Sequence, residues 1–174
     1  MKLVELFLDQ LKSEENSTRR VLQQVPEGRN DWKPHEKSMP LGYLSALVAA
    51  MPGWIEFMVN GEELDIASPG SAQFKPQMLA TNRELVAAFE GSLVKARAAL
   101  QATNDDHLLK PWKFVVAGQV ADERPRYMMI RDAVFSHMAH HRGQLTVYLR
   151  LNDAKVPAVY GPSADERLNQ GDCN

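Results

Sequence analysis

The chain has 174 residues, a formal net charge of −2 and 44% hydrophobic residues, a composition typical of one soluble globular domain with a sizeable core. Its 20 basic and 22 acidic residues, without a long basic run, argue against dedicated nucleic-acid binding. We expect no membrane span, and the early charges Lys2 and Glu5 do not suit a signal peptide. The single cysteine, Cys173, excludes an intrachain disulfide and favours a reducing, cytoplasmic location.

Apolar residues recur every three to four positions in four long segments, which predicts four helices. Pro52-Gly53 should kink the second helix, because proline lacks the amide hydrogen that a helix interior uses. We therefore predict an all-α fold, a four-helix bundle formed by a single domain over residues 1–174. The predicted helices span residues 2–24, 39–60, 76–102 and 125–152.

Two shorter segments complete the prediction. Trp112, Phe114 and Val116 alternate with other residues, so residues 111–121 are predicted to form a short strand or an extended crossover before the fourth helix. Ser163 and Glu166 have the spacing of a capping box, which predicts one short helix near the end of the chain.

Three of the five histidines lie within the fourth predicted helix, at His137, His140 and His141. The spacing of His137 and His141 places both rings on one helical face, the apolar face directed to the core, whereas His140 lies off that line. Such a pair can offer two nitrogens to one divalent metal ion. The alternative is a pair of core histidines that are hydrogen-bonded to backbone, water or a hydroxyl such as that of Tyr43, because an unsatisfied buried imidazole costs about 1–3 kcal/mol.

The residue types around the histidines exclude two known metal motifs. Met138 stands where a metalloprotease His-Glu-x-x-His motif needs its glutamate. No Glu-x-x-His occurs in the chain, which disfavours a ferritin-like di-iron site. His35 and His107 are predicted to be polar loop residues.

Several motifs together resemble the DinB-like family of bacterial proteins, and the resemblance covers nearly the whole chain. The motifs are Trp32 to Met39, Leu41-Gly42, Met51 to Trp54, Pro125-Arg126, His137 to Arg150, Val156-Pro157 and Val159 to Glu166. The resemblance implies an up-down-down-up four-helix bundle, a homodimer and one metal site between helices. Some family members are thiol transferases, and many have no assigned activity.

The resemblance also implies a metal site of three histidines. Two of them map onto His137 and His141, and the third, from the second helix, maps onto Leu47. Neither Tyr43 nor Met51, one turn away, is a good replacement ligand. If a four-ligand zinc site gives about 10–16 kcal/mol, one missing ligand should weaken binding at least about a hundredfold. We therefore expect a divalent metal such as Zn or Ni to bind weakly or not at all.

Two hypotheses for function follow. The first is a metal-dependent transferase or hydrolase with His137 and His141 as metal ligands, and with Gln144, Arg142 and Tyr43 supporting them or orienting a small-molecule substrate. The second is a metal-free, non-catalytic dimer that binds a small ligand or is associated with stress. Leu47 favours the second hypothesis and the histidine pair the first. A loop residue such as Glu62 or Glu63 could supply a third ligand.

Overall fold

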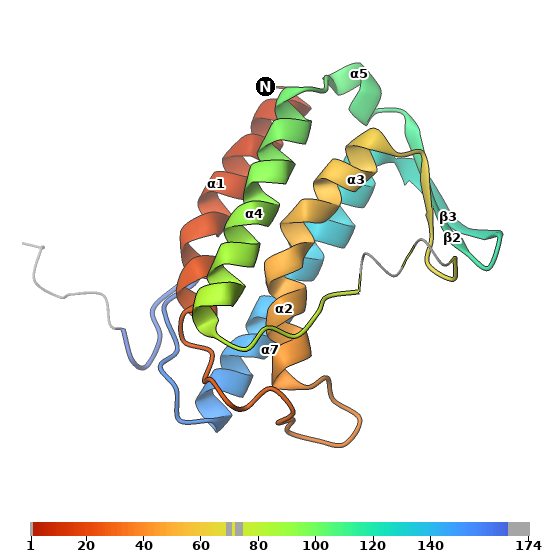
Figure 1. The fold of residues 1–174 in the computed structure, drawn as a ribbon. Helices are drawn as coiled ribbons and strands as arrows, with labels where there is room; N and C mark the ends of the chain where they lie inside the picture. Colours follow the sequence, from red (N-terminus) through yellow and green to blue (C-terminus); the bar gives the residue numbers. More distant parts are fainter. Residues whose placement is uncertain (1, 69–70, 72–74, 167–174) are drawn as a thin grey trace, which may run out of the picture.

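The computed structural model describes residues 2–68, 71 and 75–166 of the chain (Figure 1). Four long helical segments pack side by side, and a small sheet lies on the α3 side of them, away from α1. The helices are α1 (Leu3–Leu22), α2 (Leu41–Ala50), the 3-10 turn η1 (Met51–Gly53), α3 (Trp54–Asn60), α4 (Asn82–Gln101), α5 (Asp105–Leu108), α6 (Arg126–Ile130), the π-helix η3 (Arg131–Ser136) and α7 (His137–Leu151).

The four predicted helices are present, with one clear difference in bounds. The third begins at Asn82 rather than residue 76, because Thr81 and Glu84 form a capping box that satisfies the first amides of α4. The first amides of α1 are capped from a distance, since the Asp105 carboxylate accepts hydrogen bonds from Leu3 N at 3.0 Å and Val4 N at 3.1 Å.

The predicted kink at Pro52 is the 3-10 turn η1, which joins α2 and α3 into one continuous helical segment. Contrary to the expectation from sequence, this segment, Leu41–Asn60, is apolar and long enough to cross a membrane by length and composition alone. Of the 18-residue window that passes this test, 67% is buried inside the protein, as in the central helix of a folded domain.

The prediction of an all-α fold is wrong, because the chain also forms a three-stranded mixed sheet. Its strands are β1 (Glu63–Asp65), β2 (Pro111–Val116) and β3 (Gln119–Pro125), in the order β1-β2-β3. β1 runs parallel to β2, and β2 and β3 form an antiparallel hairpin. The segment for which a strand or a crossover was predicted is therefore a strand and half of a hairpin.

The hairpin turn has a clear local cause. Ala117 and Gly118 both have positive φ, 51° and 77°, as a two-residue hairpin turn with the right twist requires. The Asp65 carboxylate, at the end of β1, accepts hydrogen bonds from Ala117 N at 3.0 Å and Gly118 N at 2.9 Å. The first strand and the hairpin are thus held together at the tip of the sheet.

A buried arginine joins the sheet to the helices. Arg126, at the start of α6, is fully buried and donates hydrogen bonds to the carbonyls of Met58 at 3.0 Å, Gly61 at 2.9 Å and Pro111 at 3.2 Å. It also forms an ion pair with Glu62 at 2.8 Å. The end of α3, the start of β2 and α6 therefore share one polar junction.

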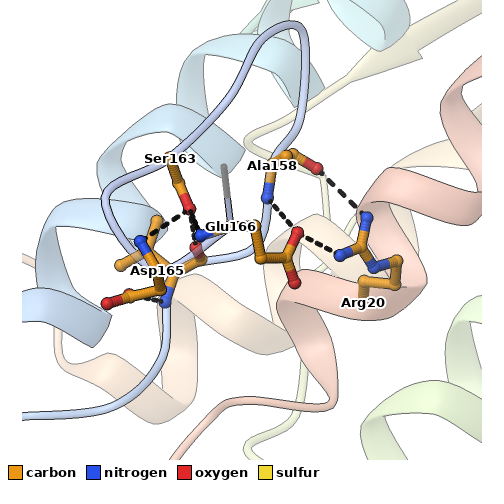
Figure 2. A network of polar contacts seen from close by, with 6 residues as sticks. Arg20, Ala158, Ser163, Asp165 and Glu166 are labelled. Carbon is orange, nitrogen blue, oxygen red and sulfur yellow. Dashed lines mark hydrogen bonds and ion pairs between the residues drawn. The ribbon is translucent and has the colours of Figure 1, made fainter. Parts of the chain in front are cut away.

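After α7 the chain returns along α1. Figure 2 shows the contact: the Glu166 carboxylate pairs with Arg20 of α1 and accepts a hydrogen bond from Ala158 N at 2.8 Å. The Ser163 hydroxyl accepts hydrogen bonds from the amides of Asp165 at 3.2 Å and Glu166 at 3.0 Å. Up to residue 166 these bonds close a turn, and the chain forms no helix there. The remainder of the predicted terminal helix lies outside the described residues.

Candidate ligand pocket and histidine pair

A pocket of about 640 Å³ opens between the α2–α3 segment, the sheet and the α6–α7 segment. Most of its wall is apolar, and the polar residues include the histidine pair and a charged group near the sheet. Its aromatic wall is Trp54, Phe57, Trp112 and Phe114; its aliphatic wall includes Met39, Leu47, Met58, Leu64, Ile66 and Met129; its polar residues include Tyr43, Lys75, Asp122, Arg124, Asp132, His137 and His141. The size and the mixed wall are those of a small-molecule site.

The two histidines of α7 are in direct contact at one end of this pocket. Nε2 of His137 lies 2.8 Å from Nε2 of His141, a hydrogen-bond distance. Nδ1 of His141 lies 2.7 Å from the side-chain oxygen Oε1 of Gln144. The predicted one-turn spacing therefore brings the rings together, with Gln144 behind the second ring.

The π-helix η3 positions the first ring. At its end, the amide of His137 donates to the carbonyl of Asp132, five residues back, and not to Ala133 four residues back as in an α-helix. His137 therefore begins α7 directly after the π-helix.

Both rings favour the neutral form. Burial is the main cause that lowers the pKa of His137, and the neighbouring His141 lowers it further, against the hydrogen bond to Ala133. Burial likewise lowers the pKa of His141, against the hydrogen bond with Gln144. At neutral pH the pair is therefore uncharged.

Leu47 lies where the family resemblance implies a third histidine. It lines the same pocket as His137 and His141 and is only 7% exposed. Glu62 and Glu63, the loop residues considered as replacements, do not line the pocket, and Glu62 is paired with Arg126. Within residues 2–68, 71 and 75–166, no three His, Cys, Asp or Glu side chains are close enough to share a metal ion.

The other predicted site residues divide into two groups. Tyr43 lines the pocket, one turn before Leu47 on α2. Arg142 does not: it is buried on the other side of α7, where it pairs with Glu14 of α1 at 2.7 Å. The predicted role of Arg142 in orienting a substrate therefore finds no support in this pocket, because Arg142 is buried against α1.

The remaining histidines serve local structure. Nε2 of His107 lies 2.8 Å from the carbonyl of Val59, and Nδ1 of His35 accepts from the amide of Lys37 at 3.2 Å. His140 is exposed beside the ring of His141. Cys173 lies outside the described residues.

Sequence reasoning missed the charged group of the pocket. Arg124 of β3 bonds to Asp122 on the same strand at 2.9 Å and to Asp132 of the π-helix at 2.7 Å. These side chains come from a strand and a helix whose contact was not predicted. The only signal in the sequence is that Arg124 and Asp132 lie close together along the chain, on either side of the boundary between the strand and the helix. Arg131 also pairs with Asp132 at 2.7 Å, so two guanidinium groups balance two carboxylates and this part of the wall carries no net charge.

Comparison with known proteins matches the pattern of helices and motifs to one family. The family model named DinB family matches residues 1–170. The chain belongs to the DinB family. Two solved structures have the same fold at low identity. The first is a DinB-like protein, YjoA, from Bacillus subtilis, with 17% identity and a TM-score of 0.65, and the match covers 93% of this chain and 99% of that one. The second is a DinB-like protein from Bacillus cereus, with 21% identity and a TM-score of 0.67, and the match covers 90% of this chain and 97% of that one.

No curated protein matches this DinB-family chain. The family assignment therefore stands on the family model, and the fold on the two structures, which support a common architecture without adding a substrate or a reaction.

Proposed function

We propose that this DinB-family protein binds a small, largely apolar organic molecule in the pocket between the α2–α3 segment, the sheet and the α6–α7 segment. The observation that carries the proposal is the pocket itself. It holds about 640 Å³ and has aromatic and aliphatic walls, with polar groups at the histidine pair, at the Arg124 group and at Tyr43, Ser71 and Lys75.

The donor set does not fit the metal site that the family resemblance implies. A catalytic zinc needs three protein ligands that leave one position open, but Leu47 occupies the place of the third histidine. No Asp, Glu, Cys or further His within residues 2–68, 71 and 75–166 completes a set of three with His137 and His141. We therefore do not propose a metal-dependent transferase or hydrolase, and a divalent ion such as Zn or Ni is proposed to bind weakly at best.

The proposal is tested with an apolar fluorescent dye, anilinonaphthalene sulfonate, titrated into the native protein. We expect saturable binding at one site per chain. Ala133, a half-buried pocket residue, is changed in the variant Ala133→Phe to fill the space, which should abolish the bound-dye fluorescence. The matched control is Ala87→Phe, on an exposed face of α4, which should leave binding unchanged.

Two outcomes would contradict the proposal. One is a native protein that gives no saturable dye signal. The other is equal dye binding by native protein and Ala133→Phe, with both variants folded by circular dichroism, since the dye would then bind elsewhere.

Assembly and location complete the proposal. We propose that the protein is a homodimer acting in the cytoplasm, supported by the family resemblance and by exposed apolar side chains on α7, Val147 at 56% and Leu151 at 55% exposure. Neither nucleic acid nor a membrane is a proposed partner.

A further inference from the structure

One hydrogen-bond donor in the wall of the pocket lacks a partner. Trp112 of β2 lines the pocket and is only 1% exposed. Within the part of the chain that the structure describes, its indole Nε1–H is buried and meets no hydrogen-bond acceptor. The ring of Phe57 stands perpendicular to the indole, with 6.1 Å between centroids, but an aromatic face is at best a weak acceptor. Buried tryptophan N–H groups usually have a partner, so this donor indicates an acceptor from outside the chain.

The neighbours of Trp112 explain why the protein supplies no acceptor itself. Arg124 of β3 lies directly opposite Trp112 in the sheet and lines the same pocket, and a guanidinium group only donates hydrogen bonds. The carboxylates of this wall already accept from arginines. Asp122 accepts from Nε of Arg124 at 2.9 Å. Asp132 accepts from Arg124 and from Arg131, each at 2.7 Å.

The same wall limits the chemistry of the group that a ligand presents there. A group that only donates, such as an ammonium, cannot satisfy the indole N–H. A carboxylate or phosphate would bring a negative charge to side chains whose own charges balance, two guanidinium groups against two carboxylates. A carbonyl oxygen accepts a hydrogen bond and brings no net charge, so it fits this wall best.

We propose that the pocket binds an apolar molecule that carries a neutral carbonyl group, and that the carbonyl oxygen accepts a hydrogen bond from Nε1–H of Trp112. Trp54, Phe57 and Phe114 provide aromatic wall for the apolar part of the molecule. Because Nε1 is buried, a side chain beside it must shift when the oxygen arrives. This inference rests on the proposed function, since it names the class of molecule that the pocket binds.

The first test uses two probes of the same shape, 2-acetylnaphthalene and 2-isopropenylnaphthalene. The ketone oxygen of the first is a CH₂ group in the second, so only the first can accept a hydrogen bond. NMR spectra of protein labelled with ¹⁵N at tryptophan follow the indole N–H signals of Trp32, Trp54 and Trp112, assigned with the variants Trp32→Phe and Trp54→Phe. We expect the ketone, and not the hydrocarbon, to move the Trp112 proton signal downfield, because a hydrogen bond deshields its proton.

The second test measures the affinity of both probes for native protein and for variants. Trp112→Phe keeps an aromatic ring and removes the N–H, so it should weaken binding of the ketone more than binding of the hydrocarbon, by a further factor of about 3–10. Trp54→Phe is the matched control, because it removes the indole N–H of another tryptophan in the same wall. It should change the affinity for both probes by the same factor.

Three outcomes would overturn the inference. If both probes bind equally well and move the Trp112 signal alike, a bound water or the Phe57 ring is the partner of the indole, and the pocket remains a site for apolar molecules in general. If the loss specific to the ketone occurs in Trp54→Phe instead, the carbonyl group binds elsewhere in the pocket. If neither probe binds and anilinonaphthalene sulfonate gives no saturable signal, the proposed function fails as well.

Discussion

At the scale of the residue, the properties of this protein depend on how buried polar side chains find partners. His137 and His141 lie on the apolar stripe of α7 and contact each other through their Nε2 atoms, and His141 also contacts Gln144. Two imidazoles on the apolar stripe of one helix thus find polar partners on that same helix.

The lowered pKa values of His137 and His141 predict how stability varies with pH. Both pKa values are lower in the folded than in the unfolded protein, so near and below about pH 6.5 the unfolded chain binds more protons than the folded one. The free energy of unfolding should therefore be largest well above this pH and should fall as the pH drops through it. Urea unfolding at pH 7.5 and 5.5 should show a smaller loss for the double variant His137→Leu/His141→Leu than for the native protein.

His140→Gln, at an exposed position one residue away, is the control and should lose as much stability as the native protein. The same pH dependence in the native protein and the double variant would show that other groups cause it.

At the scale of the element, turns and caps decide where segments begin and how they pair. The Ala117-Gly118 turn determines the β2–β3 register, and the Thr81–Glu84 capping box determines the start of α4. The π-helix has a comparable local effect, since the amide of His137 at its end bonds to the carbonyl of Asp132, five residues back.

Two glycine substitutions should have opposite effects. Gly118 has φ of +77°, so Gly118→Ala should destabilise the protein by about 1 kcal/mol through backbone strain, although no atom lies in the way of a Cβ. Gly143, inside α7, has equally open space and helical backbone, so Gly143→Ala should stabilise by about 0.5–1 kcal/mol. Thermal unfolding of both variants measures the difference, and a shift of the same sign in both would contradict the explanation.

At the scale of the whole molecule, buried arginines join elements that are distant in sequence. Arg126 ties α3, β2 and α6 through three carbonyls, and Arg142 ties α7 to Glu14 and Thr18 of α1. A buried guanidinium is stable only with such a full set of partners, so each junction holds its elements in one arrangement.

Arg126→Met should therefore be strongly destabilising, by about 3 kcal/mol or more, because it leaves the carbonyls of Met58, Gly61 and Pro111 without their donor. Arg124→Met is the matched control: its side chain is 35% exposed and its ion pairs are screened by water, so it should cost no more than about 1 kcal/mol. Denaturant unfolding gives both values, and equal costs would show that burial is not what makes Arg126 important.

The proposed homodimer is also tested at this scale. Light scattering at micromolar concentration should give about twice the chain mass of 19.5 kDa, and Val147→Lys, on the exposed face of α7, should move the value toward the monomer if that face is buried between subunits. A native mass near 19.5 kDa would contradict the dimer. A Val147→Lys variant that stays dimeric would show that the subunits meet through another face.

The sequence by itself determined the helices, the family and the histidine pair. Residues that recur every three to four positions predict a helix wherever it packs, which is why the first, second and fourth predicted helices agree with the structure to within a few residues. The spacing of His137 and His141 is a property of one helix, so their contact could also be predicted.

Only the tertiary structure decided the sheet, the pocket and the partners of the Arg142 side chain. β1 has three residues and gains its hydrogen bonds from a strand about 50 positions away, Glu63 opposite Lys113, so no local pattern marks it. The charged group of Arg124 and Asp132 exists because β3 ends beside the π-helix. Arg142 and Gln144 are two residues apart, yet one pairs with α1 and the other with His141, since the direction of a helical side chain has a meaning only once its neighbours are in place.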